Sequence, residues 1–239
     1  MNHFFAQKSN EESGFLSKDD SHHALRVLRL GIGDLISVSY GDGIVYLAEI
    51  SSEQKNAVSF SILKERWTQE KPQLSLAIAP TKSNDRFEIA LEKTCELGVD
   101  RIFPIICDHS ERKVYKQERG KRVLEAAFKQ SHKGYMPELK ECLSFKALLE
   151  LGLSFPQKYI AALSDDYPSK KISSLNLYEP SLVLIGPEGD FSKSEIELAR
   201  EAGFELISLG SEVLRTETAA ILVSALANAQ RDFRSAKKS

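Results

Sequence analysis

The alternation of apolar and polar side chains that is typical of β-strands dominates the first part of the chain. Residues 35–40 and 44–50 alternate in this way on either side of Gly41-Asp42-Gly43. An Asp-Gly turn between two such runs predicts a β-hairpin. Residues 57–63 alternate similarly, so we expect a third strand there.

The same part of the chain contains one predicted helix. Its periodicity runs over residues 19–30 and ends at Gly31, and it would place Arg26 and Arg29 on one face. Strands and helix together indicate a small β-rich domain over residues 1–70. We expect three aromatic residues of this domain in its core: Phe4, Phe5 and Trp67.

Beyond Pro72 the pattern changes to apolar runs of strand length that alternate with helical periodicity. Helices are predicted over 84–97, with Gly98 as the C-cap, and over 117–133. Two more helices follow the last two strands. The predicted strands are 74–79, 102–106, 159–163, 182–185 and 205–209. This alternation predicts an α/β domain over residues 71–239, with a parallel sheet covered on both faces.

Two strand ends carry loops that suit a ligand, because ligands bind beyond the carboxyl ends of strands in an open parallel sheet. The first loop is Ile185-Gly-Pro-Glu-Gly189, whose glycines let a ligand approach the backbone. Ser192 and Glu195 form a predicted capping box for the next helix. The loop is neither G-x-G-x-x-G nor a P-loop, which argues against a nucleotide triphosphatase. A tight turn without any ligand explains the spacing equally well.

The second loop leads into an apolar helix. Thr216 and Thr218 are competent N-caps, and Glu217 suits the positive end of the helix. Capping alone therefore accounts for these three residues. It does not account for Arg215, because a cation beside the positive end of a helix is unfavourable. We expect Arg215 to face an anion or a ligand.

Composition narrows the class of protein. The chain has 239 residues and a formal net charge of −2, with 28% charged and 42% hydrophobic residues. These values predict a folded chain of one or two domains and exclude a histone-like nucleic-acid binder. No window approaches 18 uninterrupted apolar residues, and the first ten residues lack the pattern of a secretion signal. We expect a cytoplasmic protein with no contact to a membrane.

The near-neutral total hides an uneven distribution of charge. Residues 1–70 carry a local charge of −3 and residues 101–146 one of +5. Six cations gather in one short stretch: Arg112, Lys113, Lys116, Arg119, Lys121 and Arg122. By itself such a run is typical of a solvated face. Beside a site that acts on RNA it becomes a rim of phosphate contacts.

The cysteines and histidines argue against a metal site. Cys95, Cys107 and Cys142 are widely spaced and include no C-x-x-C pair. This spacing favours reduced, buried or partly buried thiols over a disulfide framework or a zinc site. The five histidines show no ligand spacing. We therefore expect no metal.

Six motifs in this order resemble one known family over nearly the whole chain. They are His23-Ala-Leu-Arg-Val-Leu-Arg29, Lys82-Ser-Asn-Asp-Arg86, Lys93-Thr-Cys-Glu-Leu-Gly-Val99, Gln130-Ser131, Ile185-Gly-Pro-Glu-Gly189 and Leu214-Arg-Thr-Glu-Thr-Ala219. The chain resembles the 16S ribosomal RNA uridine N3-methyltransferases, the RsmE family of the SPOUT superfamily. Each motif alone is a weak signal of membership in the family, and the six in this order are a specific one.

The resemblance implies a fold and a cofactor. Residues 1–70 correspond to a PUA-like, RNA-binding β-barrel. Residues 71–239 correspond to a SPOUT-type, trefoil-knotted domain that forms a homodimer. That domain binds S-adenosylmethionine in the knot, largely through backbone atoms. The matching cofactor positions in this chain are Leu163, Ile185, Gly186, Gly189, Leu209, Gly210, Val213, Leu214 and Thr218.

The implied activity is methylation of N3 of a specific uridine in 16S ribosomal RNA of the small subunit. N3 carries a proton, so that proton must leave or the resulting anion must be stabilised. Arg215 is our candidate for the cation that orients the base or stabilises its carbonyl oxygens. Glu217 is a candidate base, and a capping role explains it equally well. The residues expected to contact RNA are His23, Arg26, Arg29, Lys82, Arg86, Arg112, Lys113 and Lys133.

Two positions depart from the family pattern. Asp190 stands where the family usually has a second glycine; because Asp tolerates a left-handed turn, we expect the pocket to survive. Lys133 stands near a position where the family tends to have Arg. If that Arg makes a bidentate contact with RNA, Lys weakens the contact.

Two other functions stay open. One is a ribose 2′-O-methyltransferase, against which the Leu214–Ala219 motif argues. The other is a non-catalytic ribosome-assembly factor, which Asp190 favours.

Overall fold

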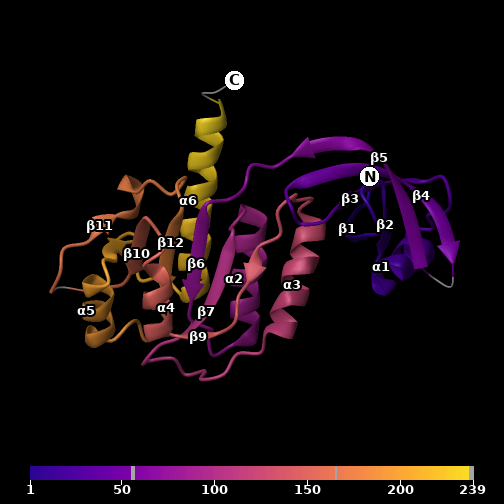
Figure 1. The fold of residues 1–239 in the computed structure, drawn as a ribbon. Coiled ribbons are helices and arrows are strands. Elements are labelled where there is room, and N and C mark those ends of the chain that lie inside the picture. Colours follow the sequence, from indigo (N-terminus) through magenta and orange to yellow (C-terminus); the bar gives the residue numbers. More distant parts are fainter. Residues whose placement is uncertain (55–56, 165, 237–239) are drawn as a thin grey trace. The chain divides into compact units, whose positions relative to one another are not determined.

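The computed structural model describes residues 1–54, 57–164 and 166–236 (Figure 1). The chain divides into two compact units. The first, called the barrel unit below, contains residues 1–71 and 125–136; the second, called the sheet unit, contains residues 72–124 and 137–239. Helix α3 (Gln117–Gln130) begins in the sheet unit and ends in the barrel unit.

The barrel unit is built on a closed barrel with the strand order β1-β2-β5-β4-β3. Its strands are β1 (His3–Lys8), β2 (Ser13–Leu16), β3 (Leu35–Ser39), β4 (Ile44–Gln54) and β5 (Ala57–Thr68). The predicted hairpin is confirmed, since β3 and β4 pair antiparallel around Gly41 and Gly43, which both have positive φ. The third predicted strand is confirmed as β5. Strands β1 and β2 were not predicted.

The barrel core contains Phe4 and Phe60, which are buried. The prediction that Trp67 is a core residue is wrong, because its side chain is 41% exposed. Strand β5 runs on to Thr68, and all its residues from Leu63 onward are exposed. Phe5 is half-buried and packs edge-on against Phe128 of α3, with ring centroids 5.4 Å apart.

The predicted helix over residues 19–30 is shorter than expected. Helix α1 covers Lys18–His22 and passes into a π-helix (η1) over His23–Val27. The chain then reverses at Arg29, whose φ is 56°, and not at Gly31. Arg29 therefore lies outside the helix, so the prediction that it shares a helical face with Arg26 is wrong.

The end of α3 is fixed to the barrel by charge and by backbone hydrogen bonds. The ammonium of Lys129 lies 2.8 Å from a carboxylate oxygen of Asp20 on α1 and 3.3 Å from one of Glu125. Just beyond the helix, the backbone N–H groups of Gly134 and Tyr135 both donate to the side-chain oxygen of Gln69. Residues 125–136 are thus an integral part of the barrel unit.

Replacing Lys129 with Met is expected to lower the free energy of unfolding by about 2–4 kcal/mol, because the nearly buried Asp20 then lacks its partner. Burial lowers the pKa of Lys129, but the hydrogen bond and charge of Asp20, with Glu125, raise it overall above its ordinary value. The stabilisation is therefore complete below a pH of about 10.4 and declines above it. Urea denaturation of both proteins measures this. Lys193→Met, which breaks an exposed pair with Asp166, is the control and should cost less than about 1 kcal/mol.

The sheet unit contains a fully parallel sheet with the order β11-β13-β10-β12-β6-β7-β8, and β9 pairs with β7. Its strands are β6 (Leu74–Ile78), β7 (Arg101–Ile106), β8 (Glu138–Leu139), β9 (Leu143–Ser144), β10 (Gln157–Ala161), β11 (Lys170–Lys171), β12 (Ser181–Ile185) and β13 (Glu205–Ser208). All five predicted strands are confirmed. The two-residue strands β8, β9 and β11 were not predicted.

Helices cover both faces of this sheet, as predicted. They are α2 (Asn84–Leu97), α3, α4 (Phe145–Gly152), α5 (Lys193–Glu201) and α6 (Thr216–Ala236), with a 3-10 turn (η2) at Ile172–Ser174. Helix α6 lies against β6 and β12 and also packs against α2. Helices α4 and α5 pack against the opposite side chains of the strands, including Ala77 and Leu184. Helix α4 was not predicted.

Two helix ends agree closely with the sequence. Helix α2 ends at Gly98, whose φ of 80° gives the left-handed C-cap. Helix α5 begins with the capping box of Ser192 and Glu195. The α/β fold with an N-terminal barrel is confirmed, and the knotted path stays a prediction. None of the helices among the described residues is long and apolar enough to cross a membrane.

A hollow at the carboxyl edge of the sheet as the candidate functional site

The carboxyl ends of β10, β12 and β13 surround a hollow in the sheet unit. Three loops form its wall: one after β10, one between β12 and α5, and one between β13 and α6. Its lining residues are Ala161, Ala162, Leu163, Ile185, Gly186, Pro187, Glu188, Asp190, Ile207, Ser208, Leu209, Gly210, Glu212, Val213, Leu214, Thr216 and Ala219. Below we call it the carboxyl-edge hollow. Its position agrees with the general rule for ligands in open α/β sheets.

Seven of the nine positions matched to the cofactor site line this hollow. They are Leu163, Ile185, Gly186, Leu209, Gly210, Val213 and Leu214. Gly189 and Thr218 do not line it. Gly189 faces His109, whose ring nitrogen lies 3.0 Å from the Gly189 carbonyl oxygen, and Thr218 is exposed on the first turn of α6. The sequence missed Glu188 and Glu212, which both border the hollow.

Asp190 joins two of the three loops. Its φ is 59°, the left-handed conformation that Asp adopts more readily than most residues. One carboxylate oxygen accepts a hydrogen bond from the N–H of Leu163, at 3.0 Å, and the other accepts one from Phe191, at 2.8 Å. The residue that departs from the family pattern therefore holds the loop after β10 against the loop after β12.

Thr216 joins the third loop to the second. Its buried hydroxyl donates to the carbonyl oxygen of Gly186, at 2.9 Å. This bond fixes the start of α6 against the end of β12. By residue type, Thr216 and Thr218 are equally competent N-caps. In the structure neither is the N-cap, because α6 begins at Thr216 and Arg215 holds that position. Only long-range packing shows that Thr216 faces the hollow.

The loop between β13 and α6 exposes backbone and apolar side chains at the rim. Gly210 has a φ of 138°, which residues other than glycine rarely adopt. The backbone N–H of Gly210 donates a hydrogen bond to the hydroxyl of Ser208. Leu163 and Val213 are 61% and 82% exposed. Apolar side chains so exposed at a concave rim suit a ligand that covers them.

The two candidate catalytic residues differ in their surroundings. Arg215 is exposed, between Leu214 and Thr216, which both line the hollow. Its own carbonyl accepts the first hydrogen bond of α6, from Ala219. Glu217 is 9% exposed and does not line the hollow. One of its carboxylate oxygens has no hydrogen-bond partner among the residues that the structure describes.

The capping box of α5 also fixes a neighbouring strand end. Glu195 is buried, and its two carboxylate oxygens accept hydrogen bonds from the N–H groups of Ser192 and Asp108, each at 2.9 Å. Asp108 follows β7, and its side chain in turn accepts a hydrogen bond from the hydroxyl of Ser192, at 2.7 Å. These hydrogen bonds fix Ser192, the last residue of the loop from 186 to 192, to Glu195 and to Asp108.

Two of the predicted RNA-contacting residues lie next to the hollow. The backbone N–H of Lys82 donates to a carboxylate oxygen of Glu188, at 3.1 Å. The guanidinium of Arg112 donates to the carbonyl of Lys82, at 3.0 Å, and to the side chain of Asn84. The exposed ammonium of Lys82 pairs with Glu111 at 2.8 Å, which raises its pKa. Cations therefore border the side of the hollow that Glu188 forms.

The eight predicted RNA contacts are divided equally between the two units. Arg86 is half-buried on the first turn of α2, and Lys113 donates to the carbonyls of Cys107 and Asp108. The other four belong to the barrel unit. Of these, His23, Arg26 and Arg29 are exposed and Lys133 is half-buried.

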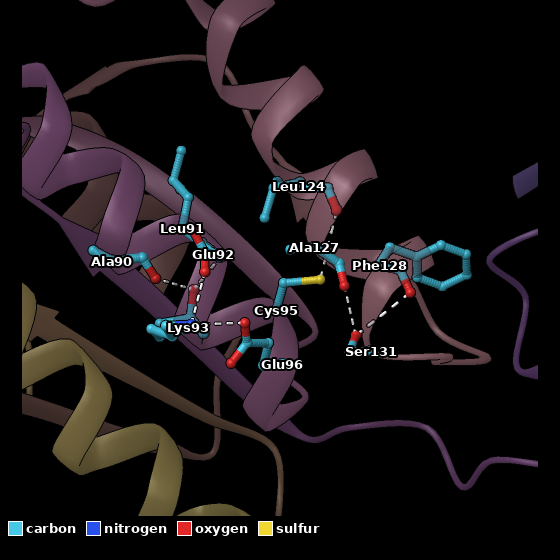
Figure 2. A network of polar contacts seen from close by, with 11 residues as sticks. Ala90, Leu91, Glu92, Lys93, Cys95, Glu96, Leu124, Ala127, Phe128 and Ser131 are labelled. Carbon is cyan, nitrogen blue, oxygen red and sulfur yellow. Dashed lines mark hydrogen bonds and ion pairs between the residues drawn. The ribbon is translucent and has the colours of Figure 1, made fainter. Parts of the chain in front are cut away.

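One of the six motifs has a structural role (Figure 2). Lys93 on α2 lies between Glu92 and Glu96, whose hydrogen bonds raise the pKa of its ammonium. The buried thiol of Cys95 lies 3.7 Å from the carbonyl oxygen of Leu124 on α3. The motif therefore packs α2 against α3 and takes no part in the hollow.

The cysteines are buried or partly buried, as predicted. Cys95 and Cys107 are buried, Cys142 is half-buried, and none of the three forms a disulfide among the described residues. Burial and the carboxylate of Glu195 raise the pKa of the Cys107 thiol, which makes it unreactive at neutral pH. Among the described residues, no group of three or more His, Cys, Asp or Glu side chains could hold a metal ion.

Comparison with known proteins decides the family. A family model described as an RNA methyltransferase domain matches residues 69–228, and one described as an RNA methyltransferase PUA domain matches residues 16–63. The chain belongs to the RNA methyltransferase family. This result confirms the enzyme class that the six motifs predict, and the PUA match agrees with the closed barrel.

Individual relatives confirm the expected branch of the family. Ribosomal RNA small subunit methyltransferase E of Mesomycoplasma hyopneumoniae is 29% identical, over 93% of this chain and 97% of the relative. A probable rRNA-methyltransferase from Porphyromonas gingivalis has a similar structure, with a TM-score of 0.86, 32% identity, and coverage of 98% of this chain and 100% of that one. Ribosomal RNA small subunit methyltransferase E from Neisseria gonorrhoeae, solved with S-adenosyl methionine, has a TM-score of 0.82, 26% identity and 97% coverage of both chains.

Proposed function

We propose that this protein transfers a methyl group from S-adenosylmethionine to N3 of a uridine in 16S ribosomal RNA. The observation that carries the proposal is the carboxyl-edge hollow, lined by the loops that the family motifs predict. The names of the relatives from Mesomycoplasma hyopneumoniae and Neisseria gonorrhoeae support ribosomal RNA of the small subunit as substrate. The choice of N3 rests on the resemblance of the Leu214–Ala219 motif.

The chemistry of the hollow fits S-adenosylmethionine. Its apolar wall, which includes Ile185, Ile207 and Leu214, suits an adenine ring, and the space beside Gly210 is open, so a ligand can approach the backbone there. Glu188 and Glu212 supply negative charge for a cationic ligand. Bound there, S-adenosylmethionine supplies an electrophilic methyl group on a sulfonium. No side chain of the protein needs to act as a nucleophile.

Arg215 is the residue that we propose to act on the base. Its exposed side chain stands immediately before α6, between two lining residues. There it orients uracil through the carbonyl oxygens and stabilises the negative charge that they gain when N3 loses its proton. Glu217 stays a candidate base. Its burial and its position outside the hollow favour a role in the first turn of α6.

We also propose a homodimer that works on the small ribosomal subunit in the cytoplasm. The family resemblance supports the dimer, and so does the outer surface of α6, where Leu222 is partly exposed and Phe233 is 74% exposed. A second protomer would cover such side chains. The cytoplasmic location follows from the proposed ribosomal substrate.

Two measurements separate this proposal from its alternatives. Calorimetric titration with S-adenosylmethionine tests the cofactor, and binding of the cofactor is expected. An absence of heat at millimolar cofactor would indicate a non-catalytic assembly factor. Mass spectrometry of nucleosides from treated small subunits then distinguishes N3-methyluridine from a ribose 2′-O-methylated product.

Asp190→Gly is expected to weaken binding of S-adenosylmethionine about five- to tenfold. The variant loses the charge-assisted hydrogen bond to the N–H of Leu163, worth about 1.5–3 kcal/mol, and glycine recovers part of this by accepting the left-handed turn. Calorimetry measures the dissociation constant. Asp190→Asn, which keeps an acceptor oxygen and tolerates the turn, is the matched control. If the glycine variant and the original protein bind S-adenosylmethionine with equal affinity, the proposal that Asp190 supports the pocket by joining its two loops is contradicted.

A further inference from the structure

A second cleft lies in the sheet unit, between the start of α2 and the segment that leads into α3. Its lining residues are Asn84, Phe87, Glu88, Arg112, Val114, Tyr115, Lys116, Arg119 and Gly120. Below we call it the α2–α3 cleft. It does not share a lining residue with the carboxyl-edge hollow, and the proposed function does not use it.

Tyr115 contributes an aromatic ring to the cleft. Tyr115 is half-buried, and its ring packs edge-on against Phe87, with centroids 4.9 Å apart. Its hydroxyl is buried beside Gly120, Leu91 and Leu139, and burial raises the pKa of Tyr115 to about 12. The hydroxyl is therefore closed off from the cleft, and the residue offers apolar ring surface to a ligand.

Three cations line the same cleft. Arg112 is held in place by Asn84 and by the carbonyl of Lys82. Arg119 pairs with Glu88, and Lys116 is exposed. Ordered guanidinium groups beside an ammonium suit a phosphodiester, since they lose little side-chain entropy when the anion binds.

The mouth of the cleft also has an apolar surface. Val114, between Lys113 and Tyr115, is 72% exposed. An exposed apolar side chain beside an aromatic ring suits the flat face of a nucleobase. Cations for the phosphate and an apolar surface for the base together match one nucleotide of single-stranded RNA.

One short stretch of backbone separates the cleft from the carboxyl-edge hollow. The N–H of Lys82 donates to Glu188, which lines the hollow, and the carbonyl of Lys82 accepts from Arg112, which lines the cleft. The two sites are therefore neighbours along the surface of a single unit. We infer that the α2–α3 cleft is a second nucleotide subsite, which holds a nucleotide next to the uridine that is methylated. This inference rests on the proposed function and adds a contact that fixes the RNA strand.

Photocrosslinking from the cleft tests the position of the RNA. Val114→benzoylphenylalanine places a photoreactive group at the mouth without removing a proposed hydrogen bond. The full-length variant is irradiated on small ribosomal subunits that lack the methyl group, and reverse transcription maps the crosslinks. Crosslinks to immediate neighbours of the methylated uridine are expected. Crosslinks to a ribosomal protein, or to RNA remote from that uridine, would overturn the inference.

Two substitutions test the chemistry of the cleft. Val114→Ala removes most of the exposed apolar contact at the mouth, and we expect KM for small subunits to rise about two- to fivefold. Lys116→Glu is expected to raise KM further and to flatten its salt dependence. Lys146→Glu, an equal charge change at an exposed site on α4, is the control and should leave KM unchanged.

The readouts separate this inference from the proposed function. Failure of the proposed function appears as an absence of N3-methyluridine with the original protein. Failure of the subsite appears as normal methylation by the original protein and an unchanged KM in both cleft variants. Affinity for S-adenosylmethionine, measured by calorimetry, is expected to stay the same in all three variants, because the cleft does not border the carboxyl-edge hollow.

Discussion

Arg215→Ala is expected to lower the rate of methyl transfer by about 100- to 1000-fold, the usual cost of removing one group that stabilises a developing negative charge. Affinity for S-adenosylmethionine should change less than about threefold, because the exposed guanidinium is not part of the hollow's wall. Single-turnover methylation of small subunits and calorimetry measure the two quantities separately. The combination distinguishes a role at the base from a role in cofactor binding.

Arg215→Lys provides the matched control. It keeps the positive charge and loses the planar, bidentate donor geometry of the guanidinium. We expect a rate between those of the alanine variant and the original protein. Full activity of the alanine variant would contradict the assignment. Equal loss in both variants would show that bidentate geometry, and not charge alone, is required.

Glu195→Ala is expected to lower the free energy of unfolding by about 3–4 kcal/mol. The change leaves the N–H groups of Ser192 and Asp108 without their acceptor and removes half of the capping box, and each such loss costs about 1–3 kcal/mol. Because the network supports the loop from 186 to 192, affinity for S-adenosylmethionine should fall as well. Thermal unfolding monitored by circular dichroism measures the first effect.

Glu201→Ala on the same helix is the control for this prediction. Glu201 is exposed at the last position of α5, where a negative charge is unfavourable. Its removal is expected to change stability by less than about 0.5 kcal/mol. A similar loss of stability in both variants would contradict a specific role for the buried carboxylate.

Features set by local geometry could be predicted from the sequence. The hairpin at Gly41–Gly43, the left-handed cap at Gly98 and the capping box at Ser192 each depend on residues a few positions apart. The five apolar strands of the sheet unit were recognisable because burial on both faces produces continuous apolar runs. These features place the two loops of the hollow at the same edge of the sheet.

Features set by distant contacts could not be predicted. Arg29 adopts a left-handed conformation although Gly31 was available nearby, because η1 displaces the end of the helix. Trp67 lies on a part of β5 that extends past the buried barrel. Residues 125–136 belong to the barrel unit through the ion pair of Lys129 with Asp20, which is far away in sequence. No local pattern contains this information.

The candidate site shows the same division. The family resemblance predicted seven lining positions, but the bond between Asp190 and the N–H of Leu163 joins residues that are 27 positions apart. The choice of Thr216 over Thr218 depends on the carbonyl of Gly186. The α2–α3 cleft is lined by Arg112, Lys116 and Arg119 from the basic stretch that the sequence singled out, and the structure adds Phe87 and Glu88 from α2.

Nucleoside mass spectrometry tests the central claim most directly. Small ribosomal subunits from cells that lack the protein are incubated with the purified protein and S-adenosylmethionine carrying a labelled methyl group. The 16S ribosomal RNA is then digested to nucleosides. The proposed function predicts labelled N3-methyluridine, and its loss in Arg215→Ala. Label in a ribose 2′-O-methylated nucleoside, or an absence of label in RNA despite measured binding of the cofactor, would contradict it.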